Sequence, residues 1–335
     1  MKRSLLEYLV CFECQRPLQL SEAREVAGEI ESGVLRCDAC AMRAPVIAGI
    51  PRFVPPSLGE EERITALAFG YEWTHFAELT DQYEQQFLDW IAPVSAKEFR
   101  GKVVLDGGCG KGRHLVCSAR FGAKEVIGFD LSQAVESAYA NTRHFPNVHV
   151  IQADIHRLPL RRESFDFAYS VGVLHHLPSP RKGFEAILPL VRPGGRVSAW
   201  VYGRENNGWI VHLVTPLRRV ITARMPLRLL DVLSGLITAL CLYPAVKLVY
   251  RPVNRFAKPL SRFLFYNDYL AYIARFSFRE LHSIVFDHLV APTAHYLRRE
   301  EFQSWFVRED LCEPLIAWHN RNSWRGTAVR CSSRD

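Results

Sequence analysis

The sequence predicts an α/β protein with a doubly wound, Rossmann-like parallel sheet, a small metal-binding domain before it and a helical cap inserted into it. Three observations predict this architecture. Short apolar segments alternate with helical segments over residues 99–202, which indicates parallel strands with helical crossovers. Two Cys-x-x-Cys pairs lie near the N-terminus. The segment 203–292 is too long for an ordinary loop and precedes the rest of the core, residues 293–330.

Length and charge narrow the class of protein. The chain has 335 residues, of which 48% are hydrophobic, so it can bury a substantial core. The net charge of +7 is concentrated in residues 206–262, where nine basic residues face the single acid Asp231. The N-terminus has no signal-peptide pattern, which predicts a cytoplasmic protein whose close cysteine pairs ligate metal rather than form disulfides.

The first element is predicted to be a zinc ribbon over residues 1–56. Four thiolates from two tight turns can close a tetrahedral site, and with all four positions taken the metal is expected to be structural. The alternative is two unrelated redox pairs. The following segment, with Pro45 and Gly49-Ile50-Pro51, resembles the end of a short bacterial zinc-ribbon family. The expected ligands are Cys11, Cys14, Cys37 and Cys40.

A helical linker is expected over residues 57–98. Prolines end the preceding strand, and Glu60-Glu61-Glu62 favours a first helical turn. The helical pattern from Ile64 to Trp90 is rich in aromatic residues. It predicts either a helix pair packed on the sheet or a lid over a ligand, to which Tyr71 and Trp73 would belong.

The parallel core begins with a strand, a glycine-rich turn and a helix start at residues 103–114. Glycine allows a sharp turn and close approach of the backbone to a ligand. Asp106 ends the strand, where an acid would repel a pyrophosphate but suits a ligand that carries an ammonium and a sulfonium. Lys111, inside the loop, is expected to be solvated. Asp130 and Asp154 end the next two strands, so all three acids are predicted to meet at the carboxyl edge of the sheet.

The order of these motifs resembles the class I S-adenosylmethionine-dependent methyltransferases of the small-molecule type. The matching segments are Asp-x-Gly-Cys-Gly-x-Gly at 106–112, Leu-His-His-Leu at 174–177 and Pro-Gly-Gly at 193–195. The resemblance implies S-adenosyl-L-methionine as cofactor, with the methionine end near the glycine loop, the ribose on Asp130 and the adenine by Asp154. The residues expected to bind it are Asp106, Gly108, Gly110, Asp130, Leu131, Asp154, Ile155 and Ser170.

Two adjacent histidines are the candidates for a catalytic base. His175 and His176 lie in the turn that would face the methyl acceptor, and imidazole titrates near neutrality. The alternative is that at least one of them is a hydrogen-bonded structural element. Four further residues are candidates for lining the acceptor pocket: Tyr202, Asp287, His295 and Tyr296.

The insertion 203–292 is predicted to form a helical cap. Its uncharged run, Val232–Val246, contains Pro244 and is shorter than the roughly eighteen residues that suggest a membrane span. A buried cap helix whose basic side chains extend into solvent is therefore expected. Peripheral membrane contact through residues 206–262 remains the alternative. After the cap, a helix at 298–306 and a hairpin turning at 320–322 are expected to close the sheet.

The predicted activity is methyl transfer from S-adenosyl-L-methionine to a small, hydrophobic organic acceptor bound beneath the cap. The acceptor atom, oxygen, nitrogen or carbon, and the oligomeric state stay open. One alternative is methylation of an RNA base, with the ribbon and the basic segment holding the nucleic acid, although the many aliphatic residues among the cations make this less favoured. Another is a non-enzymatic docking or scaffold protein. Nicotinamide-dependent redox chemistry is disfavoured by the glycine spacing and by Asp106.

Overall fold

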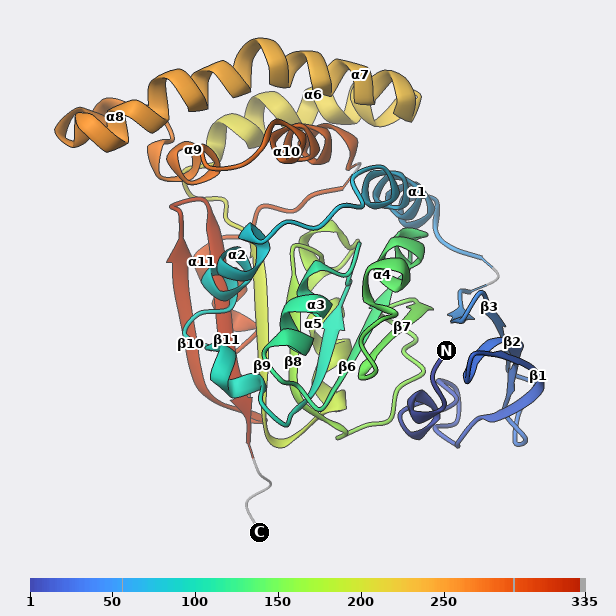
Figure 1. The fold of residues 1–335 in the computed structure, drawn as a ribbon. Coiled ribbons are helices and arrows are strands. Elements are labelled where there is room, and N and C mark those ends of the chain that lie inside the picture. Colours follow the sequence, from blue (N-terminus) through green and yellow to red (C-terminus); the bar gives the residue numbers. More distant parts are fainter. Residues whose placement is uncertain (56, 292, 332–335) are drawn as a thin grey trace.

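A computed structural model describes residues 1–55, 57–291 and 293–331 and confirms the predicted α/β fold. A single sheet of eleven strands runs through the molecule in the order β1-β2-β3-β4-β7-β6-β5-β8-β9-β11-β10. Figure 1 shows helices on both faces of the core sheet and a separate helical layer over one of its edges. Pro56 and Pro292, at two of the expected boundaries, lie outside the described residues.

The central strands are parallel and carry the site. From β5 the chain moves outward to β6 and β7 on one side, then returns to β8 and β9 on the other. This reversal on either side of β5 creates the crevice in which doubly wound sheets bind ligands. The core strands are β5 (Val103–Gly107), β6 (Glu125–Asp130), β7 (Val148–Ala153), β8 (Phe165–Val171) and β9 (Val191–Tyr202). The helices are α3 (Arg113–Arg120), α4 (Ala134–Thr142) and α5 (Pro180–Ile187).

The N-terminal ribbon is fused to this sheet. Its last strand pairs in parallel with β7, with Arg52 opposite Gln152 and Phe53 opposite Ala153. Leu9 forms a bridge to Leu160. The ribbon strands are β1 (Gln19–Val26), β2 (Glu29–Arg36), β3 (Arg43–Ile47) and β4 (Ile50–Phe53). The ribbon therefore extends the sheet, a connection that its sequence pattern did not predict.

Two helices precede the core, as the aromatic pattern predicts. These are α1 (Glu60–His75) and α2 (Gln82–Ile91). The Glu62 carboxylate accepts a hydrogen bond from the backbone N–H of Gly59 at 3.0 Å and so caps the start of α1. Figure 1 places α1 at the edge of the sheet, next to the helical cap.

The cap is two helical layers deep (Figure 1). One continuous helix, Leu227–Phe256, is long and apolar enough to cross a membrane by length and composition. The helix extends beyond the uncharged run 232–246 and continues through Pro244. Only 22% of its most apolar stretch is buried, which corrects the expectation of a buried cap helix. Wide π-turns at 238–242 and 245–250 flank Pro244 and accommodate its missing N–H. The cap elements are α6 (Thr215–Val220), α7 (Leu227–Ile237), α8 (Arg251–Phe256), α9 (Asn267–Ile273) and α10 (Phe278–Val290).

The chain ends with α11 (Arg299–Ser304) and an antiparallel hairpin at the edge of the sheet. Its strands, β10 (Leu311–His319) and β11 (Ser323–Arg330), turn where the sequence predicts. Cys312 and Cys331 form a disulfide with a Cα–Cα distance of 5.4 Å. The expectation of metal ligation concerned the two close N-terminal pairs, and this disulfide was not predicted. The two residues come together only through the register of the hairpin, which the cysteine spacing does not reveal.

Candidate functional site

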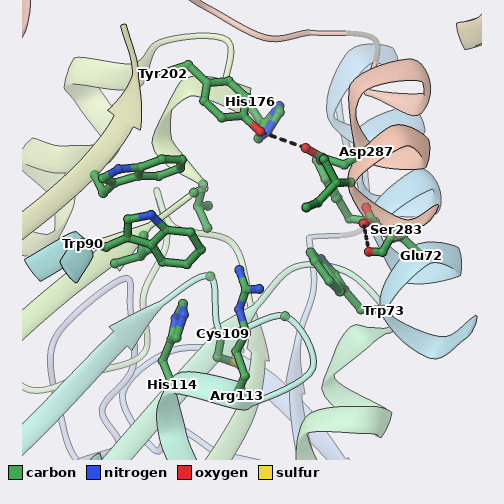
Figure 2. Close-up of a pocket in the computed structure, with 18 of the residues that line it drawn as sticks. Glu72, Trp73, Trp90, Cys109, Arg113, His114, His176, Tyr202, Ser283 and Asp287 are labelled. Atoms are coloured by element: carbon green, nitrogen blue, oxygen red, sulfur yellow. Dashed lines mark hydrogen bonds between the residues drawn. The ribbon is translucent and has the colours of Figure 1, made fainter. Parts of the chain in front are cut away.

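A cavity of about 250 Å³ lies at the carboxyl edge of the parallel strands, beneath the cap. Its wall includes the glycine loop after β5, the ends of β6, β7 and β8, and residues of α1, α2, α9 and α10. Figure 2 shows Arg113 and His114 at the loop side, with Tyr202, His176 and Asp287 across the cavity from them. The cavity thus joins the predicted cofactor half to the predicted acceptor half.

The glycine loop forms the floor of the cavity. Gly108 has φ +83°, and a Cβ there would lie 2.4 Å from Cγ2 of Val173, so only glycine fits. The N–H groups of Gly108 and Cys109 donate to the carbonyl oxygen of Phe129 at 2.8 and 2.9 Å, which ties the loop to β6. A Cβ on Gly110 would lie 3.4 Å from the Trp73 ring. The loop therefore lies between the sheet and an aromatic cover from α1.

Asp130, at the end of β6, is held in place by its neighbours. Its Oδ1 accepts from the Ser132 N–H at 2.8 Å and from the Ser132 hydroxyl at 2.6 Å. Its Oδ2 accepts from the Gly110 N–H at 3.0 Å. Each carboxylate oxygen can accept about two hydrogen bonds. One acceptor position, on Oδ2, is left for a ligand hydroxyl among the described contacts.

Six of the eight predicted cofactor residues line the cavity. They are Gly108, Gly110, Asp130, Leu131, Asp154 and Ile155. The other two, Asp106 and Ser170, lie behind the loop and are almost fully buried. The Ser170 hydroxyl donates to the carbonyl of Gly107 at 2.8 Å and so supports the loop from below.

Asp106 carries a buried carboxyl group. Both of its oxygens lack a hydrogen-bond partner among the residues that the structure describes. Burial, chiefly, raises its pKa to about 8. A cation close to the loop would favour the ionised form, in keeping with the charge preference inferred from the sequence.

The two predicted catalytic histidines differ in their surroundings. His176 lines the cavity, its Nδ1 lies 2.8 Å from the carbonyl oxygen of Thr293, and its ring packs edge-on against Phe69. His175 is completely buried behind it, is absent from the cavity wall, and packs against Tyr202 at 4.1 Å between ring centroids. Burial lowers the pKa of both imidazoles. Of the pair, His176 is therefore the one that a ligand can reach.

The predicted acceptor residues form most of one wall. The Tyr202 hydroxyl donates to Oδ2 of Asp287 at 2.8 Å, an interaction drawn in Figure 2. Tyr296 stacks on Tyr202 at 5.5 Å. Burial raises the pKa of Tyr202 well above its ordinary value, so this phenol stays protonated as a donor. His295 is set back from the cavity, and its N–H donates to the carbonyl of His175.

A second carboxyl group in this wall escaped prediction. Glu72 of α1 is fully buried, and its Oε1 accepts from the Ser283 hydroxyl at 2.9 Å (Figure 2). Its Oε2 has no partner within the described part of the chain. Burial and the nearby Asp287 raise the pKa of Glu72 well above its ordinary value. The available signal was an acid in the middle of an aromatic helical stripe.

Two cations lie near the loop. The prediction that Lys111 is solvated is wrong: its side chain is buried, and Nζ donates to the carbonyl oxygens of Phe76 and Glu78. Burial lowers the pKa of Lys111 to about 7. Arg113 faces the rings of Trp73 and Trp90 at 5.4 and 5.1 Å. Of the predicted lid pair, Trp73 lines the cavity, whereas Tyr71 packs against Phe286 of the cap.

The four N-terminal cysteines come together as predicted. Their sulfur atoms all lie within 4.8 Å of one another. The Sγ atoms of Cys11 and Cys40 are 3.4 Å apart, as are those of Cys14 and Cys37. This arrangement can hold a metal ion at the ribbon, away from the cavity.

Comparison with known proteins identifies the central part of the chain. Residues 105–199 match a family model described as "Methyltransferase domain". A tRNA U34 carboxymethyltransferase of Pseudoalteromonas atlantica is 34% identical over 117 residues, covering 33% of this chain and 36% of that protein. An uncharacterised 37.1 kDa protein of transposon TN4556 from Streptomyces fradiae is 40% identical over 129 residues, covering 34% and 37%. The chain thus spans about a third of the length of these relatives.

The chain also shows partial similarity to solved structures. An S-adenosylmethionine dependent methyltransferase from Mesorhizobium loti is 30% identical, with a TM-score of 0.30, and the match covers 32% of this chain and 48% of that one. The family model and the strand order together make the core a class I S-adenosylmethionine-dependent methyltransferase domain. The matched residues contain the glycine loop, the three strand-end acids and both histidines.

Proposed function

We propose that the protein transfers a methyl group from S-adenosyl-L-methionine to a small, hydrophobic organic acceptor that binds beneath the cap. The observation that carries this proposal is that the cofactor residues of the methyltransferase domain and an aromatic wall from the cap line one and the same cavity. A nucleotide in a long RNA would have to enter past that cap. A compact acceptor fits the enclosure directly.

The residues that line the cofactor half of the cavity suit S-adenosyl-L-methionine. Gly108 and Gly110 present bare backbone to the cavity, Asp130 keeps an acceptor position for a ribose hydroxyl, and Leu131 and Ile155 offer apolar contacts for an adenine. When bound, the cofactor supplies a methyl group already activated by its sulfonium. Asp130 can supply negative charge near the loop, and Asp106 would add to it when a nearby cation favours its ionised form. The chain's main task is then to align the acceptor, which can account for a large part of a rate enhancement.

The acceptor wall can both orient a polar group and accept a proton. The His176 Nδ1–H donates to the Thr293 carbonyl, which leaves Nε2 as the acceptor nitrogen of the neutral ring. Its lowered pKa keeps the imidazole neutral at physiological pH and so ready to take a proton. Beside it, the Tyr202 hydroxyl donates to Asp287, so the remaining lone pairs of these two groups can accept a hydrogen bond from a polar group of the methyl acceptor. We assign His176 as the base for an acceptor that must lose a proton.

We further propose that the ribbon holds a structural zinc ion. Zinc–sulfur bonds of about 2.3 Å in a tetrahedron place the sulfur atoms about 3.8 Å apart, which the observed spacing can meet with small adjustments. All four positions would be filled by thiolates, so no position would remain for a substrate. The ion would stabilise the ribbon and, through the pairing of β4 with β7, the edge of the sheet.

Transfer to tRNA is the second candidate, because curated relatives are named tRNA U34 carboxymethyltransferases. Their similarity covers about a third of this chain and about a third of their own length. The exposed cations of residues 206–262 lie outside the cavity and among exposed leucines and phenylalanines, an unsuitable surface for a phosphate backbone. A purely scaffolding role is less well supported, because the cofactor residues remain assembled around an open cavity.

Calorimetric titration with S-adenosylhomocysteine, with NADH as the comparison ligand, tests the proposal. We expect micromolar binding of S-adenosylhomocysteine alone. Radiolabelled methyl transfer to an organic extract and to total tRNA then separates the two acceptor classes. Label in the organic phase supports the first candidate, whereas label that is found in tRNA alone overturns it.

A further inference from the structure

The outer face of the cap is unusually apolar for a surface in contact with water. The long helix Leu227–Phe256 buries one stripe of residues against the rest of the cap and exposes the opposite stripe. Leu240, Leu248 and Phe256 are 75%, 73% and 78% exposed, and Phe263, just beyond the helix, is 73% exposed. Figure 1 shows α7 and α8 in the outermost layer of the molecule. Contiguous exposed apolar surfaces of this kind mark sites of association.

Cations surround this apolar face. Nine basic residues and one acid lie within residues 206–262. Of the basic residues, Arg218 is buried and Lys247 donates to two carbonyl oxygens of the cap. The sole acid, Asp231, turns inward and lies 3.3 Å from His282. Seven cations are exposed: Arg219, Arg224, Arg228, Arg251, Arg255, Lys258 and Arg262.

We propose that this cap face, residues 213–263, docks on the surface of an anionic lipid bilayer. Exposed leucine and phenylalanine side chains would enter the boundary between headgroups and acyl chains, and the arginines and Lys258 would contact anionic headgroups. The positive charge of this face favours an anionic bilayer over the other possible partners. A second copy of the chain would bring two equally basic faces together, and an RNA would leave the apolar side chains in contact with phosphates and water.

The packing of the helix makes it lie on the bilayer rather than cross it. Its inner stripe is fully buried at Leu230, near the start of the helix, and at Val246, in its second half. Leu230 packs in a cluster with Phe286 and Leu289 of α10, and Val246 in another with Ile273. A spanning orientation would expose both clusters to lipid and pull the helix off α10. The helix is therefore placed in the plane of the membrane surface.

The test is sedimentation of the full-length protein with vesicles of phosphatidylcholine alone or of equimolar phosphatidylcholine and phosphatidylglycerol. We expect strong binding to the anionic vesicles. The charge variant Arg251→Gln/Arg255→Gln/Arg262→Gln is expected to bind them about 100-fold more weakly, since each cation near an anionic surface contributes about a fivefold factor. Its matched control, Lys97→Gln/Arg120→Gln/Lys124→Gln, removes the same charge at the opposite end of the sheet and should bind like the wild type.

A second pair of variants tests the apolar part. Leu240→Ser/Leu248→Ser/Phe256→Ser is expected to lose at least about tenfold in affinity, because its side chains supply the insertion. The control Ile47→Ser/Val307→Ser, exposed by 54% and 65% away from the cap, should bind normally. RNA binding would persist in the apolar variant, so retention of binding there contradicts the proposal.

Three other results would overturn the inference. The first is failure to sediment with anionic vesicles. The second is a dimer in light scattering that the apolar variant disrupts, which would assign the face to a second copy. The third is resistance to extraction from vesicles by alkaline carbonate, which indicates a spanning helix. Titration of every variant with S-adenosylhomocysteine shows whether the core remains intact, so failure of docking is distinguished from failure of the proposed activity.

Discussion

Replacement of Asp130 by alanine gives the sharpest test of the cofactor site. Two Ser132 donors occupy Oδ1 and the Gly110 N–H occupies one position on Oδ2, so one charge-assisted hydrogen bond remains available to a ribose hydroxyl. Such a bond contributes about 1.5–3 kcal/mol. We therefore expect Asp130→Ala to weaken the affinity for S-adenosylhomocysteine by about 10- to 150-fold in calorimetry, with the fold retained.

Loss of affinity alone could also come from a loosened glycine loop. A thermodynamic cycle separates the two causes by combining the variant with S-adenosylhomocysteine that lacks both ribose hydroxyls. The expected coupling energy is about 1.5–3 kcal/mol. Ser132→Ala serves as the control, because it removes one donor to Asp130 but keeps the carboxylate, and should change affinity only slightly. A coupling energy near zero would show that Asp130 holds the loop and does not bind the ribose.

Three further predictions concern the ribbon and the buried titratable groups. Cys11→Ser is expected to lose zinc in elemental analysis, whereas the exposed Cys241→Ser keeps it; a full equivalent of metal in the first variant contradicts the four-thiolate site. Burial lowers the pKa of His319 to about 4, so its contribution to stability is present above pH 6.5 and is lost as the pH falls toward 4. The free energy of unfolding is measured in urea at pH 7 and pH 5. Between these pH values the wild type should lose about 2 kcal/mol more than His319→Gln. An equal loss in both proteins would refute the prediction. Glu72 has a raised pKa, so its contribution is present below pH 4.5 and is lost as the pH rises. Glu72→Gln should therefore gain stability relative to the wild type as the pH rises above 4.5 in the same urea unfolding experiments. A stability difference between the two proteins that does not change with pH would contradict this.

The parts of the fold that were predictable from sequence depend on local patterns. The glycine loop, the acids at the ends of β6 and β7, and the hairpin at residues 311–330 each combine a short apolar run with its own turn signal. The convergence of those acids then follows from parallel strand geometry alone. Six of the eight expected cofactor residues accordingly line the cavity.

The features that escaped prediction depend on packing between distant segments. Lys111 is buried because α1 and the following loop fold over the glycine loop. Glu72 is buried where α1 packs against α10 at Ser283. No local pattern near either residue encodes these contacts. The pairing of β4 with β7 and the disulfide of Cys312 with Cys331 likewise arise from register. Asp106 and Ser170 lie at the predicted ends of β5 and β8, yet they are buried and do not line the cavity. Their order in the sequence correctly predicts the carboxyl edge of the sheet, but the glycine loop lies between them and the cavity.

The cap connects the two proposals, because its two faces serve different surroundings. Its outer face carries exposed Phe263 and Phe265, and the next residue, Tyr266, lines the cavity. A bilayer in contact with this segment would therefore lie one residue along the chain from the acceptor wall. If methyl transfer occurs in this cavity as proposed, the acceptor best suited to reach it is one that dissolves in the membrane. A lipid extract is accordingly the first acceptor mixture to test, and vesicle binding should be measured before that screen because it does not depend on the acceptor.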